Sequence, residues 1–345
     1  MDYPLLVLVS GDRLAGMIRP GPQNLITDLD GLQVGNAEDI GLRSGTTVLL
    51  PDTPCAMAVD VRGGGPGTRD TDALDPTCLV ETFHGLVLSG GSVFGLAAAD
   101  GVTAWLSEHG RGLPMGPKPI PVVPAAILFD LTNGGDKDWG ETNPYVDLGR
   151  AACDAAGKDF KLGNAGAGLG ATAGSLKGGL GSASSVDETG LMVGALVAAN
   201  PFGEVVVPGS KSFWAWALET AGEFGGAGAP GQVPDPLPLG LPDSGLSGTN
   251  TTIGIVATNA DLTKAQLQRV AMMAQDGMAR AIRPAHTPFD GDTIFALSTA
   301  QIRNGEIDPM RLAKIGSMAA DCFARAIARG VYEAEPLGDF PAYRG

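Results

Sequence analysis

The segment "SGLSGTNTTIGIVATNA", residues 244–260, places a Gly-, Thr- and Asn-rich turn directly before an apolar run. That run is rich in β-branched residues, which predicts a strand beginning near Thr251. The preceding residues 225–250 contain five prolines and show no periodicity, so they predict a loop. Long structureless loops inside a compact domain are uncommon and tend to be functional. The junction between loop and strand is therefore the first candidate for chemistry.

A threonine at such a junction can act as a nucleophile if a base activates its hydroxyl. Cutting the chain before the threonine frees its α-amino group, whose pKa of about 7.7–8.0 suits that role. The cut needs a loop before it, a turn-forming residue at it and a rigid strand after it. Asn250 and Thr251 meet these needs, which predicts a large chain of residues 1–250 and a small chain of residues 251–345. Alternatively, Thr251 and Thr252 simply begin an ordinary strand.

Two carboxylates stand at the start of a second strand, in "HTPFDGDT", residues 286–293. If the strands from Thr251 and Thr293 are neighbours, both carboxylates can reach the threonine. We then expect Asp292 to hold the new ammonium group and Asp290 to hold the hydroxyl. The alternatives are a solvated Asp-Gly-Asp turn or a calcium loop, and the 12-residue ligand spacing of the latter is absent.

Two further polar residues interrupt apolar surroundings. Asn200, in "LVAANPFG", follows a predicted strand, and its amide could donate to a developing oxyanion, although asparagine before proline is also a common turn residue. Lys177, in "AGSLKGGLG", could lower the pKa of a neighbouring group or hold a carboxylate; the alternative is a solvated loop lysine.

The pattern along the chain predicts alternating strands and helices, and so a layered α/β or α+β fold. Ser92 is the predicted N-cap of a helix that ends near Gly110, and residues 212–223 predict another helix. After Thr251 we expect strand, helix, strand, helix, with a Thr263 and Gln266 capping box on the first helix. The second helix is predicted to begin after Asp308 and to end at Gly330. The earlier strands are predicted at residues 46–62, 85–89, 120–131 and 188–199.

Composition narrows the class of protein. The 345 residues are 44% hydrophobic, with no apolar run near the roughly 20 residues that span a bilayer, and Asp2 precedes "PLLVLV" where a secretion signal would be basic. We therefore expect a soluble cytoplasmic protein. The net charge of −15, all of it in residues 1–250, argues against nucleic-acid and anionic membrane partners. Scattered cysteines predict buried reduced thiols rather than a metal site or disulfides: Cys55, Cys78, Cys153 and Cys322.

Five segments in order carry a family resemblance: "DVRGGGPGTRDTDALDP", "VLSGGSVFGLAAADGV", "GNAGAGLGATAG", "TNTTIGIVATNADLTKAQ" and "ARAIRPAHTPFDGDTIFAL". They resemble the DmpA-type aminopeptidase family, which includes L-aminopeptidase/D-esterases, β-peptidyl aminopeptidases and nylon-oligomer endo-hydrolases. The resemblance spans residues 24–299 and leaves residues 1–20 outside it. It implies an αββα sandwich of the N-terminal nucleophile hydrolase type, autocatalytic cleavage into two chains that stay together, and a homotetramer of processed protomers.

The resemblance also assigns site residues. Thr251 matches the first residue of the small chain and Asn200 the oxyanion asparagine, while the active-site lysine and paired aspartates of the nylon-hydrolase branch match Lys177, Asp290 and Asp292. Phe129 stands where that branch has a tyrosine. Asp130 beside it could attract a substrate ammonium group, or could simply end a strand. No metal or organic cofactor is implied.

The sequence thus predicts a self-processing amide hydrolase acting on a peptide-like or oligoamide substrate. Two alternatives remain open: an acyltransferase of the ornithine acetyltransferase type, and a non-catalytic relative that keeps the fold. The sequence does not choose between an α-peptide, a β-peptide and a 6-aminohexanoate oligomer, or between endo and exo action.

Overall fold

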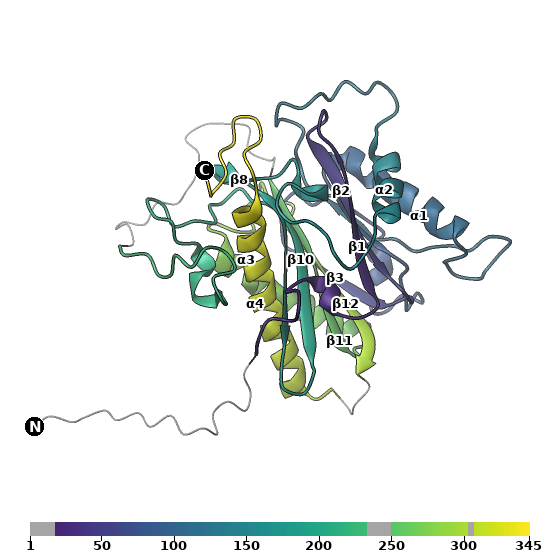
Figure 1. The fold of residues 1–345 in the computed structure, drawn as a ribbon. Coiled ribbons are helices and arrows are strands. Elements are labelled where there is room, and N and C mark those ends of the chain that lie inside the picture. The colour runs from purple at the N-terminus through teal and green to yellow at the C-terminus, as the bar shows by residue number, and fades with distance from the viewer. Residues whose placement is uncertain (1–17, 233–249, 303–306) are drawn as a thin grey trace, which may run out of the picture.

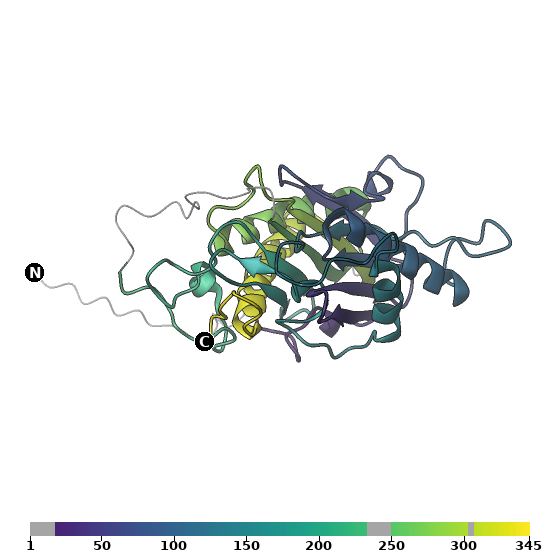
Figure 2. The ribbon, with the colours of Figure 1, turned by 90° about the horizontal axis from the view of Figure 1, so that it is seen from above.

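The computed structural model describes residues 18–232, 250–302 and 307–345. The loop predicted over residues 225–250 therefore falls mostly outside the described residues. Two five-stranded sheets stack face to face, and a pair of helices covers the outer face of each (Figure 1). Seen from above, the blue helices of the first layer and the yellow helix of the last lie on different sides of the strands (Figure 2). This is the predicted αββα arrangement.

The first sheet has the strand order β1-β2-β5-β6-β4. Its strands are β1 Leu32–Asp39, β2 Ser44–Pro51, β5 Leu86–Ser89, β6 Ala125–Ile127 and β4 Thr68–Arg69. Helices α1 (Ala98–Glu108) and α2 (Tyr145–Asp154) pack on its outer face (Figure 1). Short 3-10 helices precede or connect these elements: Ile26–Asp28, Asp72–Leu74, Ser92–Ala97 and Gly166–Gly168.

The second sheet has the order β3-β12-β11-β10-β9. Its strands are β3 Ala56–Val61, β12 Thr293–Ile302, β11 Thr251–Ala260, β10 Met192–Asn200 and β9 Gly179–Val186. A separate hairpin pairs β7 (Thr172–Ala173) with β8 (Leu176–Lys177). The remaining elements are the 3-10 helix η6 (Trp214–Leu218) and the helices α3 (Lys264–Ala281) and α4 (Pro309–Glu333).

The central strand β11 explains how the layers hold together. Side chains alternate along a strand, so Ile253 and Ile255 enter the core between the sheets, whereas Val256 and Ala260 enter the core under α3 and α4. β11 runs parallel to β12 and antiparallel to β10. The predicted neighbourhood of the strands from Thr251 and Thr293 is therefore confirmed.

Buried polar contacts join the two predicted chains. The Lys264 Nζ donates to the carbonyl oxygens of Ala73, Asp75 and Val80 at 3.1, 2.6 and 3.0 Å. Arg325 of α4 binds both oxygens of Glu223, with Nε to Oε1 at 2.6 Å and Nη2 to Oε2 at 2.9 Å. Each contact links a residue after position 251 to one before it.

The helix boundaries after Thr251 follow their caps. The predicted capping box is present, since Thr263 accepts from the Gln266 N–H and the Gln266 side chain accepts from the Thr263 N–H. Asp308 caps α4 by accepting from the Arg311 N–H at 2.8 Å. The predicted stop at Gly330 is wrong, because α4 continues to Glu333 with Gly330 packed against β9.

Several earlier boundaries differ from the prediction. The strand predicted over 46–62 is two strands in different sheets, since prolines at 51 and 54 cannot donate to a ladder. Prolines likewise restrict the predicted strand 120–131 to β6. Ser92 does not cap a helix: it begins a 3-10 helix after Gly91, whose φ is 85°, and α1 starts only at Ala98.

The helix predicted over 212–223 is only η6, five residues of 3-10 helix. Its continuation is interrupted because nearby carboxylates take the backbone N–H groups that a helix would use. Glu219 accepts from the N–H of Phe224 at 2.9 Å, and Glu223 accepts from the N–H of Thr220 at 3.2 Å. Glu223 is itself held by Arg325.

All four cysteines are free thiols. Three are buried, and burial raises the pKa of Cys55 and Cys153 to about 12. Cys78 is partly exposed, so the expectation that all four are buried is wrong for this one. In the described part of the chain, no helix has both the length and the apolar character needed to cross a membrane.

Candidate active site

Thr251 is the first residue of β11 and lies directly opposite Asn200, the last residue of β10. Its side chain is nearly enclosed, since the residue is 4% exposed. The Thr251 hydroxyl donates to the carbonyl oxygen of Asn250, across the peptide bond that joins the two residues. The Asn250 side chain is anchored separately, with Nδ2 donating to the Pro201 carbonyl at 3.1 Å. The nucleophile candidate therefore contacts the bond predicted to break.

The N–H of Gly291 lies at the same bond. It lies 3.2 Å from the Asn250 carbonyl oxygen and 3.1 Å from the Thr251 Oγ1. A Cβ at position 291 would lie 2.7 Å from that Oγ1 and 2.7 Å from the Gly65 carbonyl oxygen, closer than side-chain carbons pack. Glycine is thus required between the two aspartates for this approach.

Asp292 is buried at the beginning of β12 and uses both carboxylate oxygens. Oδ1 accepts from the Thr252 N–H at 2.8 Å. Oδ2 accepts from the His286 N–H at 3.1 Å and contacts the His286 ring Nδ1 at 2.8 Å. The carboxylate therefore binds the backbone nitrogen that follows the α-nitrogen of Thr251 by one residue. Its other oxygen is held by His286.

Asp290 is equally buried, on the other side of Gly291. Its Oδ1 accepts from the Phe202 N–H at 3.1 Å, and its Oδ2 accepts from the N–H and hydroxyl of Thr287 at 3.0 and 2.5 Å. Burial raises its pKa, and the nearby charge of Asp292 raises it further. A solvated Asp-Gly-Asp turn is excluded, since both residues are buried.

The two expected carboxylate contacts are not made in the continuous chain. The Thr251 hydroxyl bonds to Asn250 and Gly291, and both aspartate carboxylates bond elsewhere among the described residues. In the continuous chain the α-nitrogen of Thr251 is an amide, so no ammonium group exists for Asp292 to bind.

Asn200 lies inside the site rather than in a turn. Its Oδ1 accepts from the Thr172 N–H at 2.8 Å, which fixes the amide so that Nδ2 points the other way. Nδ2 donates to the Phe129 carbonyl at 3.1 Å. Phe129 thus meets the site through its backbone, which a tyrosine or a phenylalanine supplies equally.

Lys177 is 1% exposed, so the alternative of a solvated loop lysine is wrong. It pairs with Thr172 in the β7-β8 hairpin, which links it through Thr172 to Asn200 and so to Thr251. Its Nζ donates to the carbonyl oxygens of Gly168 at 2.9 Å and Gly178 at 2.7 Å. Burial lowers the pKa of Lys177 to about 7, and the charge of Asp130 opposes that shift.

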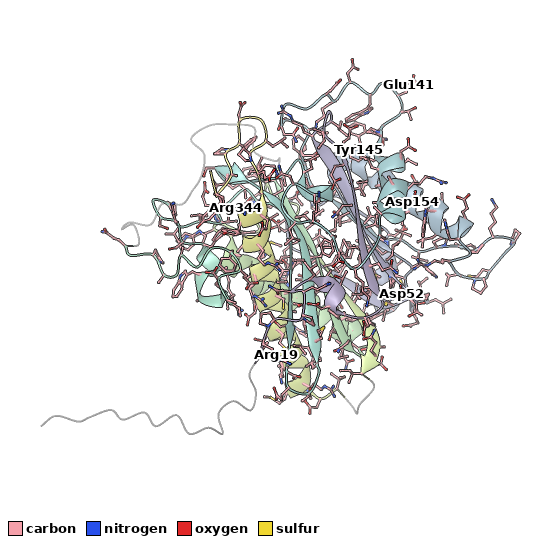
Figure 3. The ribbon with its side chains drawn as sticks, viewed as in Figure 1. Arg19, Asp52, Glu141, Tyr145, Asp154 and Arg344 are labelled. Atoms are coloured by element: carbon pink, nitrogen blue, oxygen red, sulfur yellow. The ribbon has the colours of Figure 1, made fainter. Side chains whose placement is uncertain are left out.

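Asp130 is enclosed rather than open to a substrate, with 3% of its surface exposed. Its Oδ1 accepts from the Gly91 N–H at 2.7 Å. Burial raises its pKa, which neighbouring groups, Ser44 first and Lys177 among them, partly offset. Ser44 in turn accepts from the hydroxyl of Tyr145, at the start of α2 (Figure 3), at 2.9 Å. Asp130 therefore belongs to a buried polar network near Lys177 that also includes Ser44 and Tyr145.

Three groups that make contacts in this site were not among the predicted site residues. His286 stands in the quoted segment "HTPFDGDT" and is one of only three histidines, which was a usable signal. The N–H groups of Gly291 and Thr172 gave no signal, because any residue but proline carries one.

Comparison with known proteins identifies the family of the chain. The peptidase family S58 profile matches residues 24–342. An uncharacterized aminopeptidase of Mycobacterium tuberculosis (strain ATCC 25618 / H37Rv) is 43% identical over 343 residues, covering 93% of this chain and 97% of its own. A 6-aminohexanoate-oligomer endohydrolase of Paenarthrobacter ureafaciens is 29% identical, covering 84% and 79% of the two chains.

Solved structures agree on the fold. The L-aminopeptidase D-Ala-esterase/amidase from Ochrobactrum anthropi, a variant of the Ntn hydrolase fold, superposes with a TM-score of 0.70 at 23% identity, covering 92% of this chain and 88% of its own. A β-aminopeptidase from Burkholderia sp. gives 0.66 at 21% identity, covering 94% and 91%. The sequence matches therefore identify an amide and peptide hydrolase. The chain belongs to peptidase family S58.

Proposed function

We propose that this hydrolase processes itself at the Asn250-Thr251 bond and then uses Thr251 as an N-terminal nucleophile. The observation that carries the proposal is the contact of the Thr251 hydroxyl with the Asn250 carbonyl, with the Gly291 N–H directed at both oxygens. An attacking hydroxyl and an oxyanion donor thus meet at one peptide bond.

In the processing step, the Thr251 Oγ1 attacks the Asn250 carbonyl carbon and the carbonyl oxygen becomes an oxyanion beside the Gly291 N–H. The C–N bond then breaks, and the hydroxyl proton ends on the departing nitrogen of Thr251. The result is an ester between Asn250 and the Thr251 side chain. Water hydrolyses it, giving an Asn250 carboxylate and a free Thr251. We propose that Lys177 takes part in this proton transfer indirectly: its strand partner Thr172 binds Asn200, which lies opposite Thr251, and burial lowers the pKa of Lys177 to about 7.

On a substrate, the freed α-amine of Thr251 takes the hydroxyl proton as the oxygen attacks an amide carbonyl. The amine product leaves with a proton, and water releases the acyl group as a carboxylate. We assign Asn200 and the Gly291 N–H to the oxyanion. Asp292 already holds the N–H of Thr252, so it is placed to bind the adjacent ammonium group. Asp290 accepts hydrogen bonds from the backbone N–H groups of Phe202 and Thr287, and so holds the loop around Gly291 in place.

The substrate is proposed to be a peptide-like or oligoamide compound, in keeping with the aminopeptidases and oligomer hydrolase that the chain resembles. We also infer that processed protomers assemble as a homotetramer. A panel of p-nitroanilides, β-dipeptides and 6-aminohexanoate oligomers, with added amine acceptors, separates these substrates and separates hydrolysis from acyl transfer.

Purified active protein should yield a polypeptide that begins at Thr251. The loop-strand junction and the Thr251 contact with Asn250 predict this cut, and N-terminal sequencing with intact mass measures it. Active material in which every chain has the full 35.0 kDa mass contradicts the proposal.

Gly291→Ala should slow processing by about 100-fold, comparable to displacing one oxyanion donor. The added methyl would lie 2.7 Å from the Thr251 Oγ1, so the hydroxyl or the Gly291 N–H must move. The measurement is the fraction of cleaved chain against time after expression. Gly116→Ala serves as a control, because a Cβ at that position meets nothing within 4 Å and its backbone is not left-handed. Normal processing of Gly291→Ala contradicts the assigned oxyanion role.

A further inference from the structure

A pocket lies at the carboxyl end of α3, beside the residues that lead to Asp290 and Asp292. It has a volume of about 310 Å³, and its lining includes Trp214, Arg280, Ile282, Arg283, Pro284 and His286. Thr251 is an odd-numbered residue of β11 and so faces the space between the sheets, whereas this pocket adjoins the helix layer. The pocket is therefore distinct from the predicted substrate side of Thr251.

This pocket is lined by basic side chains, although the whole chain is acidic. The protein carries 38 acidic and 23 basic residues, yet the pocket lining contains two arginines and a histidine and no carboxylate. Arg280 is already paired, with Nη1 2.6 Å from Asp321 Oδ1. Arg283 makes no ion pair with the carboxylates of the described residues, and its guanidinium lies over the Trp214 ring, 5.7 Å from the centroid. Arg283 thus offers an unpaired charge that an aromatic ring holds in place.

His286 connects this pocket to the active site. Its backbone N–H and its ring Nδ1 both contact Asp292 Oδ2, at 3.1 and 2.8 Å. With Nδ1 engaged, Nε2 is the second polar atom that the ring can offer to an occupant of the pocket. Any ligand that binds there touches the residue that orients Asp292.

We propose that this pocket binds a small carboxylate with an apolar body. The guanidinium fork of Arg283 matches a carboxylate in two parallel hydrogen bonds. Trp214, Ile282 and Pro284 give the apolar contact, and the volume is at the small end of ligand sites. Amide hydrolysis releases carboxylates, so a product of the enzyme fits this description; that link alone rests on the proposed function.

The test uses uncleaved Thr251→Ala protein, so that its result does not depend on processing. Hexanoate is titrated at constant ionic strength while the Cε1–H signals of the three histidines are followed by NMR: His84, His109 and His286. We expect a saturable shift of the His286 signal alone, and none with hexylammonium. Adding Arg283→Gln should weaken binding at least about tenfold, which is about 1.4 kcal/mol. Arg269→Gln, on the exposed face of α3, should leave it unchanged.

Two results overturn the inference: no saturable shift with hexanoate, whether or not inorganic phosphate gives one, or equal affinity after Arg283→Gln. If Thr251→Ala instead proves to be cleaved and active, the proposed function fails, while the binding result still stands or falls by itself.

Discussion

Thr251→Val should leave a single unprocessed chain of 35.0 kDa with no measurable amidase activity. Valine keeps the shape of threonine but removes the Oγ1 that contacts the Asn250 carbonyl, so neither the ester nor a later nucleophile can form. Denaturing electrophoresis and activity on an oligoamide substrate measure the two effects. Thr251→Ser should retain cleavage, since it keeps a hydroxyl at the same carbon.

Position 252 provides the matched control. The Thr252 hydroxyl is buried and makes no hydrogen bond within the described part of the chain. Thr252→Val therefore removes the same group one residue away at little or no cost in stability. It should process and hydrolyse normally, because the Thr252 backbone N–H that Asp292 binds is retained. Loss of processing in both variants would mean that the strand rather than the hydroxyl is responsible.

Lys177→Met should reduce processing by at least about 100-fold and remove a pH dependence of stability. Burial lowers the pKa of Lys177 to about 7 from 10.5, so between these pH values the unfolded chain binds a proton that the folded chain does not. The unfolding free energy contributed by Lys177 therefore rises with pH across this window, by about 1.4 kcal/mol per unit, and is lowest below pH 7.

The comparison is best made in the Thr251→Ala background, where both proteins are single chains. Urea unfolding at pH 7, 8 and 9 should give a difference between the lysine and methionine proteins that grows with pH in favour of lysine. Subtraction removes the contribution of other groups, including the thiols whose pKa burial raises. A difference that is constant with pH would show that Lys177 keeps an ordinary pKa in the folded protein.

The sequence predicted the parts of this site that depend on strand adjacency. β-branched residues after a proline-rich loop identified β11, and the position of Asp290 and Asp292 before β12 required only that two consecutive strands be neighbours. The burial of Lys177 was not predictable, because it depends on carbonyls of Gly168 and Gly178 in irregular backbone.

Other failures have the same origin. Residues 212–223 have helical composition, but Glu223 is drawn to Arg325, more than a hundred residues later in the chain. The contact of His286 with Asp292 spans six residues and was within reach of the sequence. The sequence did not reveal the fold of the turn between them. In that turn Asp290 accepts a hydrogen bond from the Thr287 N–H, which brings His286 back towards β12.

The strand order β3-β12-β11-β10-β9 makes the processing proposed at Asn250-Thr251 difficult to reverse. The two inner strands β12 and β11 come after the proposed cut in the sequence, and the strands on both sides of them come before it. Separating the fragments would require tearing hydrogen-bonded ladders on both flanks, so we expect dissociation only on unfolding. Refolding of the cleaved form then requires two chains to associate. The intact chain instead pairs the same two strands with their neighbours within one molecule. Under the proposed processing, refolding of the cleaved form should therefore depend on protein concentration, whereas folding of the intact chain should not.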